Sequence, residues 1–407
     1  MISNVLRYGS GGSLRIEVAE ESLIAACGTP KEQPVENLAA AVRQALADPL
    51  EYPPLVEGTV PGDRVLIALE DGVPRAPTVV AAIIGTLLDG RVAADGITVL
   101  HTQGDQAIGG DPLSELPELL REAIAVEEHD PANRDRLAML TSFEDGEPVL
   151  LNRSIVDADL VLPVGSVSSR RIAGYHGIHG AVFPAFSDAK TIARFRSPDV
   201  LRRDTGQKKR LVKQCDEVGW LLGVNFTIQI VPGAGDGVLR VVAGQVDAVR
   251  SAGRELYETA WGCTVPRRAR LVVAAIEGGP FQQTWQNVAQ AVATAGPLVE
   301  DDGAIAVCSA LNAEPGPAVQ RLSSSRSAAD IRREQNGQTP SDAIAALQLA
   351  HALRRGHVYL LSELDASLVE DLGLAPLDEP NDVARLARRS PSCILLANAG
   401  HVMVRIE

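Results

Sequence analysis

Residues 62–105 read GDRVLIALEDGVPRAPTVVAAIIGTLLDGRVAADGITVLHTQGD, and they set the fold class. An apolar strand pattern in residues 62–72 ends in acidic residues and a glycine. Residues 75–90 have the apolar spacing of a helix that ends at a glycine, and residues 96–105 form a second strand that runs out into a polar turn. This order predicts a doubly wound α/β fold with helices packed on a parallel sheet.

The same pattern continues on both sides of this stretch. A β segment at residues 13–21 and a helix at 34–49 precede it, and a strand at 157–169 follows it. Ligands of such sheets bind at the carboxyl ends of the strands. We therefore expect a binding site among three loops, which comprise residues 71–77, 102–110 and 165–188.

A second α/β unit is predicted in the C-terminal part of the chain. Its strands and helices are expected at residues 268–280, 284–296, 302–311, 342–356, 357–364 and 392–400. Because Pro266 interrupts the preceding helical pattern, a hinge is expected at residues 263–268. We therefore expect two α/β domains, residues 1–264 and 265–399, with a ligand cleft between them. The final strand, residues 400–407, is open to either domain.

The composition is that of a globular protein with an aliphatic core. Of the 407 residues, 45% are hydrophobic but only 3% are aromatic, which suits buried parallel strands. The net charge of −14 argues against nucleic-acid and anionic-membrane partners, because both need a basic surface. A small anionic molecule remains an expected partner, since a local pocket does not follow the net charge.

The cysteines and the first residues of the chain indicate the cellular compartment. The five cysteines are scattered and form no CxxC pair, so neither a zinc ribbon nor a disulfide framework is expected. The opening residues, MISNVLRYGSGG, lack the apolar core of a signal peptide, and no apolar run reaches membrane-spanning length. These features predict a cytoplasmic protein and leave its oligomeric state open.

Several longer motifs occur in a characteristic order. The N-terminal part contains LRYGSGGSLRIEV, ALADPLEYPPLVEGTVPGDRVLIALEDGVPRAP, EEHDPAN, GEPVLLNRSIVDADLVLPVGSV, AGYHG and FP, and the C-terminal part contains EGGPFQQTWQNVAQAVATAGPLVEDDGAIAVCSAL. In this order the chain resembles the lactate racemase family, over most of its length. The resemblance implies two α/β domains with an active site in the cleft, and an isomerase activity of the racemase or epimerase type.

The resemblance also implies a cofactor, the nickel-pincer nucleotide. In that family a lysine carries the cofactor as a thioamide, a histidine completes the nickel coordination, and two further histidines act as acid and base. Carried over to this chain, the two acid/base positions fall on Gly104 or Asp105 and on Ser169-Arg170, the lysine position on Gly180, and the nickel-binding position on Arg196. Arginine neither accepts a proton near neutral pH nor normally binds metal, and glycine forms no thioamide. The family's ordinary mechanism is therefore not expected here.

Two histidines outside the family's register, His176 and His179, are the replacement candidates for catalysis, together with Asp105. Imidazoles in a glycine-rich turn can bind a metal ion, or can transfer a proton because their pKa lies near neutral pH. Packing of the loop is the third interpretation. The sequence leaves all three open.

Further candidates surround these histidines. Those expected to bind a cofactor or ligand are Asp71, Arg75, Gly177, Gly180 and Lys190, and those expected to bind substrate are Arg170, Arg196, Trp285 and Gln286. The arginines are included because a guanidinium group holds a carboxylate or phosphate through paired hydrogen bonds. Plainer roles remain open for them: helix capping for Asp71, a solvated side chain for Lys190, surface ion pairs for the arginines, and core packing for Trp285.

Two functions follow from these observations. The first is a divergent lactate-racemase-like enzyme that binds a small anionic hydroxy acid, or a nucleotide-type ligand, between two domains and acts as a racemase or epimerase. The second is a non-catalytic relative that keeps the cleft to bind or sense such a ligand. Histidine side chains directed into the cleft would favour the first function.

Overall fold

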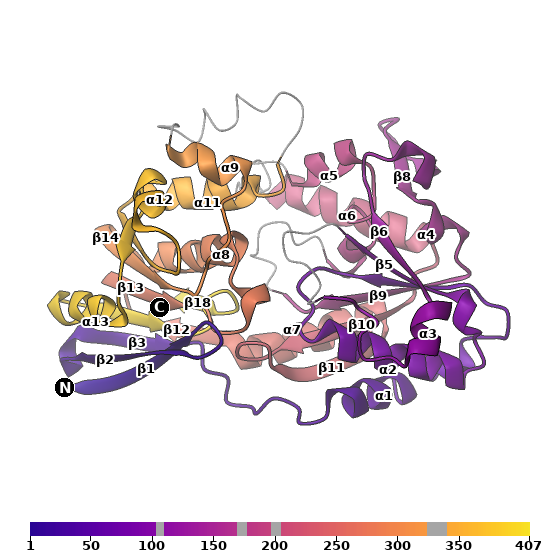
Figure 1. The fold of residues 1–407 in the computed structure, drawn as a ribbon, viewed down its shortest axis with the longest axis horizontal. Coiled ribbons are helices and arrows are strands. Elements are labelled where there is room, and N and C mark those ends of the chain that lie inside the picture. The colour runs from indigo at the N-terminus through magenta and orange to yellow at the C-terminus, as the bar shows by residue number, and fades with distance from the viewer. Residues whose placement is uncertain (103–109, 169–176, 197–204, 324–339) are drawn as a thin grey trace.

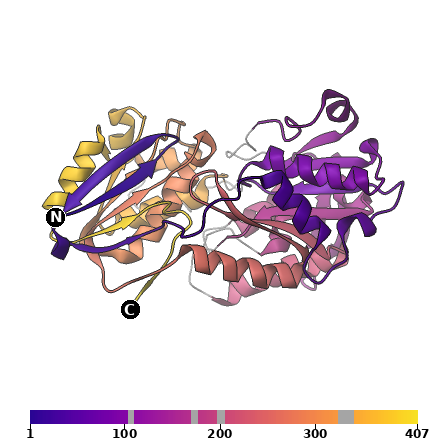
Figure 2. The same ribbon diagram turned by 90° about the horizontal axis from the view of Figure 1, so that it is seen from below.

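The computed structural model describes residues 1–102, 110–168, 177–196, 205–323 and 340–407. These residues form two α/β groups that lie side by side, each built around its own sheet (Figure 1). Figure 2 shows that the N-terminal hairpin and the C-terminus belong to the same group. The predicted α/β fold class is therefore confirmed. None of the helices in the described part of the chain is long and apolar enough to cross a membrane.

The first sheet has six strands among the described residues, in the order β11-β10-β9-β4-β5-β6. Neighbouring strands are parallel except for β10 and β11, which are antiparallel. Every residue of β4 is buried, as its apolar run predicts. The strands are β4 (Val65–Leu69), β5 (Ile97–Thr102), β6 (Ala125–His129), β9 (Leu160–Ser166), β10 (Phe226–Pro232) and β11 (Val238–Gln245).

Helices cover both faces of the first sheet. Helices α1 (Leu38–Ala47) and α2 (Ala76–Asp89) pack on one face, and α5 (Ala189–Phe195) and α6 (Thr205–Leu221) pack on the other. Helix α1 begins four residues later than the sequence pattern predicts, because the side chain of Asn37 accepts a hydrogen bond from the backbone N–H of Ala40. The remaining elements of this group are α3 (Glu118–Ala123), β7 (Leu137–Ser142), β8 (Pro148–Asn152), α4 (Arg153–Asp157) and α7 (Val246–Trp261).

The second sheet has six parallel strands within the described residues, in the order β16-β15-β14-β13-β17-β3. One face carries α8 and α11, and the other carries α13 and the hairpin of β1 and β2. The strands are β1 (Ile2–Tyr8), β2 (Gly12–Val18), β3 (Leu23–Cys27), β13 (Ala269–Ala275), β14 (Val299–Cys308), β15 (His357–Leu361), β16 (Ala375–Leu377) and β17 (Cys393–Leu396). The helices are α8 (Trp285–Ala295), α9 (Pro317–Gln320), α11 (Ala343–Leu353), α12 (Ala366–Asp371) and α13 (Pro380–Arg389).

The N-terminal segment joins the second sheet, although the sequence analysis places it with the first. Strand β3 pairs with β17 at the edge of the second sheet, and the hairpin of β1 and β2 packs on that sheet's face. This pairing joins residues that are far apart in the chain, so local sequence patterns do not reveal it. The boundary between residues 264 and 265 stays a prediction.

Two further non-local contacts lie near the predicted hinge. The final strand β18 (Met403–Ile406) pairs with β12 (Gly262–Val265), and Cys27 forms a disulfide with Cys263. The spacing of the cysteines in the sequence does not indicate this bond, because its two partners lie 236 residues apart. The disulfide joins the end of β3 to β12.

Candidate functional site

A cavity of about 380 Å³ lies between the two groups of elements. Its first wall comes from the ends of β4, β5 and β9 and from α5, and its second wall comes from α8, α11 and the turn after β17. The carboxyl ends of parallel strands therefore face the cavity from both sides. This is where ligands bind in open α/β sheets.

Four polar residues at the strand ends of the first wall form what we call the strand-end cluster: Glu70, Asp71, Thr102 and Ser166. The hydroxyl of Thr102 donates a hydrogen bond of 2.6 Å to the Asp71 carboxylate. The backbone N–H of Ser166 donates to Oε2 of Glu70 at 3.2 Å. Because β4 lies between β5 and β9, these side chains from three strands meet at one edge of the sheet.

Glu70, one of the two acidic residues of this cluster, has a raised pKa. Burial raises its pKa to about 7; the hydrogen bond from Ser166 opposes this rise, and the negative charge of Asp71 adds to it. Neighbouring Gly165 makes room for the carboxyl group, since a Cβ atom at that position would collide with Oε2 of Glu70. Glu70 therefore exchanges a proton near neutral pH at the wall of the cavity.

Arg196 brings positive charge to the first wall. It follows Phe195 at the end of α5, and both residues line the cavity. No other arginine is found among the described lining residues. The guanidinium group of Arg196 is therefore the group suited to bind a carboxylate or phosphate there. Gly180 also lines the cavity.

The second wall is rich in side-chain amides. Gln286 and Gln290 of α8 and Gln348 of α11 line the cavity; Asn398, in the turn after β17, also lines it, but its amide is hydrogen-bonded to the backbone of Gly28 and Gly235. An amide offers both a donor and an acceptor, which suits the hydroxyl groups of a ligand. Trp285, in contrast, is only 6% exposed and packs in the core with its indole N–H bonded to a backbone oxygen. Trp285 is therefore placed as a residue of the hydrophobic core.

A histidine that the sequence analysis did not select, His401, also lines the second wall. Its ring lies 5.0 Å from that of Trp261, and the Tyr257 hydroxyl donates to its backbone oxygen. Burial lowers the pKa of His401 to about 4, so its imidazole is neutral at physiological pH. It follows the strand β17, and the rule that ligands bind at strand ends would have selected it.

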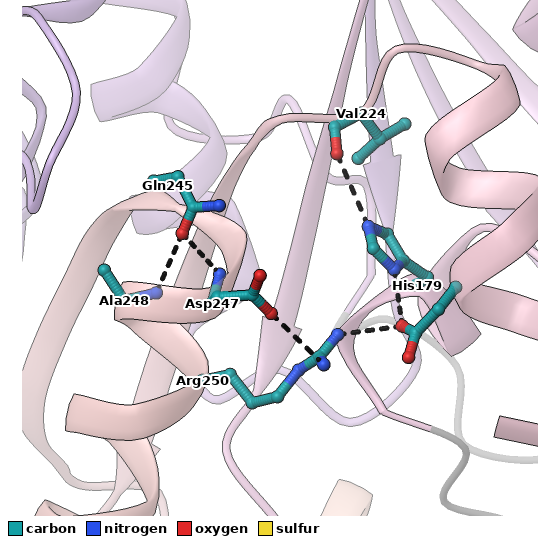
Figure 3. A network of polar contacts seen from close by, with 7 residues as sticks. His179, Val224, Gln245, Asp247, Ala248 and Arg250 are labelled. Carbon is teal, nitrogen blue, oxygen red and sulfur yellow. Dashed lines mark hydrogen bonds and ion pairs between the residues drawn. The ribbon is translucent and has the colours of Figure 1, made fainter. Parts of the chain in front are cut away.

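His179 lies outside the cavity, in a polar network beside α6 and α7 (Figure 3). Its Nδ1 lies 2.7 Å from Oδ1 of Asp216, and its Nε2 lies 3.4 Å from the backbone oxygen of Val224. Arg250 donates to the same Asp216 oxygen at 2.8 Å. Burial opposes ionisation of Asp216, but the contacts with His179 and Arg250 outweigh it and lower the pKa of this carboxyl group.

The packing of His179 supports the same conclusion. The side chain is buried, with 8% of the residue exposed, and Gly219 of α6 lies directly against the ring. A Cβ atom at Gly219 would collide with ring atoms of His179. His179 was open to three interpretations: metal binding, proton transfer and packing of the loop. The buried, hydrogen-bonded ring fits packing of the loop.

The other candidates are spread over the molecule. Arg75 is exposed before α2 and lies 3.5 Å from the hydroxyl of Thr78, and Lys190 is exposed and forms an ion pair of 2.8 Å with Glu147. Gly177 precedes the short helical turn 178–181 with a φ of 88°, which favours glycine. None of these three candidates is among the described lining residues. Asp105, Arg170 and His176 lie outside the described residues.

The described residues do not fit the nickel-pincer nucleotide. The cavity lining that the structure describes contains no lysine that would form the thioamide, and the nickel-binding position is occupied by Arg196. We therefore derive no chemical step through this cofactor.

Comparisons with known proteins agree with the fold. The chain is similar to the lactate racemase apoprotein from Thermoanaerobacterium thermosaccharolyticum, with a TM-score of 0.76 and 16% identity over 99% of this chain and 100% of that one. It is also similar to a protein from Thermotoga maritima, with a TM-score of 0.63 and 13% identity over 92% of this chain and 100% of that one. No curated protein matches the chain.

The family comparison covers the first wall of the cavity. The family described as lactate racemase N-terminal domain matches residues 8–204, which include the strand-end cluster, Gly180 and Arg196. Residues 8–204 therefore match the lactate racemase N-terminal domain family, and the fold of the whole chain is similar to that of a lactate racemase apoprotein.

Proposed function

We propose that this protein binds a small anionic hydroxy acid in the cavity between the two sheets and isomerises it by acid/base chemistry. The observation that carries the proposal is the placement of Arg196 at the same cavity as the strand-end cluster. The guanidinium group is suited to the ligand's carboxylate, and the hydrogen-bonded pair of Asp71 and Thr102 is suited to its hydroxyl group.

The residues in the cavity restrict what this chemistry can be. The described lining supplies a carboxyl group with a pKa near neutrality, Glu70, and a neutral imidazole, His401, from opposite walls. The Glu70 carboxyl group, with a pKa near neutrality, is suited to give up or take up a proton, and the neutral imidazole of His401 is suited to hydrogen-bond the ligand. Side-chain amides of the second wall are suited to orient the ligand.

Binding is tested first by isothermal titration calorimetry with the D- and L-forms of lactate, malate and glycerate, and with adenosine monophosphate for the nucleotide alternative. Arg196→Gln is expected to weaken binding of the hydroxy acids at least tenfold, because a hydrogen bond to a charged group contributes about 1.5–3 kcal/mol. The matched control is Arg210→Gln, since Arg210 is exposed and pairs with Asp145. Equal affinities of the Arg196 variant and the wild type would contradict the proposal.

Activity is tested by incubating each bound enantiomer in D₂O, with chiral chromatography and mass spectrometry of the product. Formation of the other enantiomer with one deuterium at the chiral carbon is the expected result.

The alternative function is a non-catalytic relative that binds or senses the same ligand. The observation that favours it is the environment of His179, whose ring nitrogens contact Asp216 and Val224 instead of the cavity. Tight binding of a hydroxy acid without isomerisation or deuterium exchange would support this alternative over the enzyme.

A further inference from the structure

The carboxyl group of Glu70 has an unusual set of neighbours for an acidic side chain. Its only hydrogen bond within the described residues is the one that Oε2 accepts from the backbone N–H of Ser166. No arginine or lysine forms an ion pair with it in the described part of the chain. Oε1 therefore has no protein partner there, while the residue itself lines the cavity.

The charges around Glu70 favour its neutral form. The next residue, Asp71, is negative, and the neighbouring strands bring Gly165, Ser166 and the neutral amide of Gln229, which a Cβ atom on Gly165 would meet at 3.2 Å. The other titratable groups of the described lining are Arg196, Glu277 and His401. Since Oε2 accepts a hydrogen bond from an N–H group, the proton of the neutral carboxyl group belongs on Oε1.

We propose that Glu70 is a ligand-binding residue that carries a proton in the complex, with its carboxyl O–H donating a hydrogen bond to an oxygen of the bound hydroxy acid. The inference rests on the proposed function and names a residue that the family resemblance does not assign. No covalent bond changes and no electron is transferred, because the proton comes from solvent.

This arrangement resolves a conflict of charge. An anion that enters the cavity meets Asp71 and, when Glu70 is ionised, a second negative charge beside it. Protonation of Glu70 removes that charge and adds a hydrogen-bond donor. Since the pKa of Glu70 is about 7, binding of the anion takes up protons from solvent above neutral pH.

The experiment measures affinity and proton uptake together. The wild type is titrated between pH 6 and pH 9 with the member of the lactate, malate and glycerate panel that it binds most tightly, in two buffers with different ionisation enthalpies. We expect the affinity to be constant below about pH 7 and to fall by up to tenfold per pH unit above it, with proton uptake that approaches one per ligand.

Three variants isolate Glu70. Glu70→Gln keeps the shape and a donor group but cannot ionise, so its affinity is expected to stay constant across the range without proton uptake. Gly165→Ala is expected to weaken binding at all pH values by displacing the carboxyl group, with circular dichroism to verify folding. The control Glu118→Gln, at an exposed position in the first turn of α3, is expected to behave as the wild type.

The outcomes separate this inference from the proposed function. If the wild type binds none of the panel, the proposed function fails and the role of Glu70 fails with it. If the wild type binds but takes up no proton, or if Glu70→Gln keeps the wild-type pH dependence, only the role of Glu70 is overturned.

Discussion

Two polar regions of this molecule differ in how completely their groups are paired. In the His179 network, which comprises His179, Asp216, Val224 and Arg250, each ring nitrogen has a protein partner and the ring packs against α6. In the strand-end cluster, Glu70 uses only one of its carboxyl oxygens within the described residues, and the cluster faces a cavity. The first region is sealed by protein and the second is open to a ligand.

This difference shows why residue type alone is a poor guide to function. A histidine in a glycine-rich turn has the right pKa range for catalysis, but the proton acceptors around His179 already satisfy it. A glutamate next to a buried strand looks like a helix-capping or surface residue, yet its environment brings its pKa to about 7. The comparison predicts that substitutions in the His179 network alter stability and that substitutions in the strand-end cluster alter binding.

The largest effect is expected from Gly219→Ala. The added methyl group collides with the buried ring of His179, and overpacking of this kind costs about 3 kcal/mol of unfolding free energy. Urea denaturation followed by circular dichroism measures the loss. The matched control is Gly85→Ala, because a Cβ at this helical glycine of α2 meets no atom within 4 Å, so the variant is expected to be at least as stable as the wild type. Equal stability of the two variants would show that His179 is not packed as described.

His179→Ala is expected to cost about 2 kcal/mol of unfolding free energy and to leave hydroxy-acid affinity within twofold of the wild type. It removes buried ring atoms and leaves Asp216 without one of its hydrogen bonds. Denaturation and calorimetry on the same preparation measure both quantities. A tenfold loss of affinity at unchanged stability would break the comparison and return His179 to the list of ligand-binding residues.

The smallest effect concerns pH and stability at Glu70. Its pKa in the folded protein is about 7, above the usual 4.5, so between these pH values the folded state holds more protons than the unfolded state. The unfolding free energy therefore falls as the pH rises from 4.5 to 7, by about 1.5 kcal/mol from this residue, because Glu70 is only partly buried and solvent screens part of the effect. Denaturation at pH 5 and pH 7.5 should show this decrease in the wild type and in Glu118→Gln, but not in Glu70→Gln. A decrease that persists in Glu70→Gln would mean that another group causes it.

Part of the candidate site follows from the rule that ligands bind at strand ends, and part follows from the resemblance to the lactate racemase family. Asp71, Gly180, Arg196 and Gln286 were selected from loops and motifs, and all four line the cavity. The same rule applies to Glu70 and His401, which also follow or end buried strands. These two were missed because burial, the quantity that alters their pKa values, depends on elements from elsewhere in the chain.

Lys190 and Trp285 show the opposite error. Lys190 is near the site in sequence, but the helix α5 directs it to solvent, where it pairs with Glu147. Trp285 is next to Gln286, and because neighbouring helical positions face different directions, only the glutamine lines the cavity. Nearness in the sequence does not predict which side chains line a cavity when the geometry of a helix directs adjacent side chains to different sides.

The α/β class, the buried strands such as β4 and the polar loops at their ends follow from the order of amino acids alone, because hydrophobic periodicity and glycine positions are local properties. The pairing of β3 with the second sheet, the disulfide between Cys27 and Cys263, and the position of Glu70 rather than His179 at the cavity are visible in the folded chain alone. These outcomes depend on contacts between residues far apart in the chain. Such contacts govern strand pairing, burial and the satisfaction of polar groups, and no local pattern encodes them.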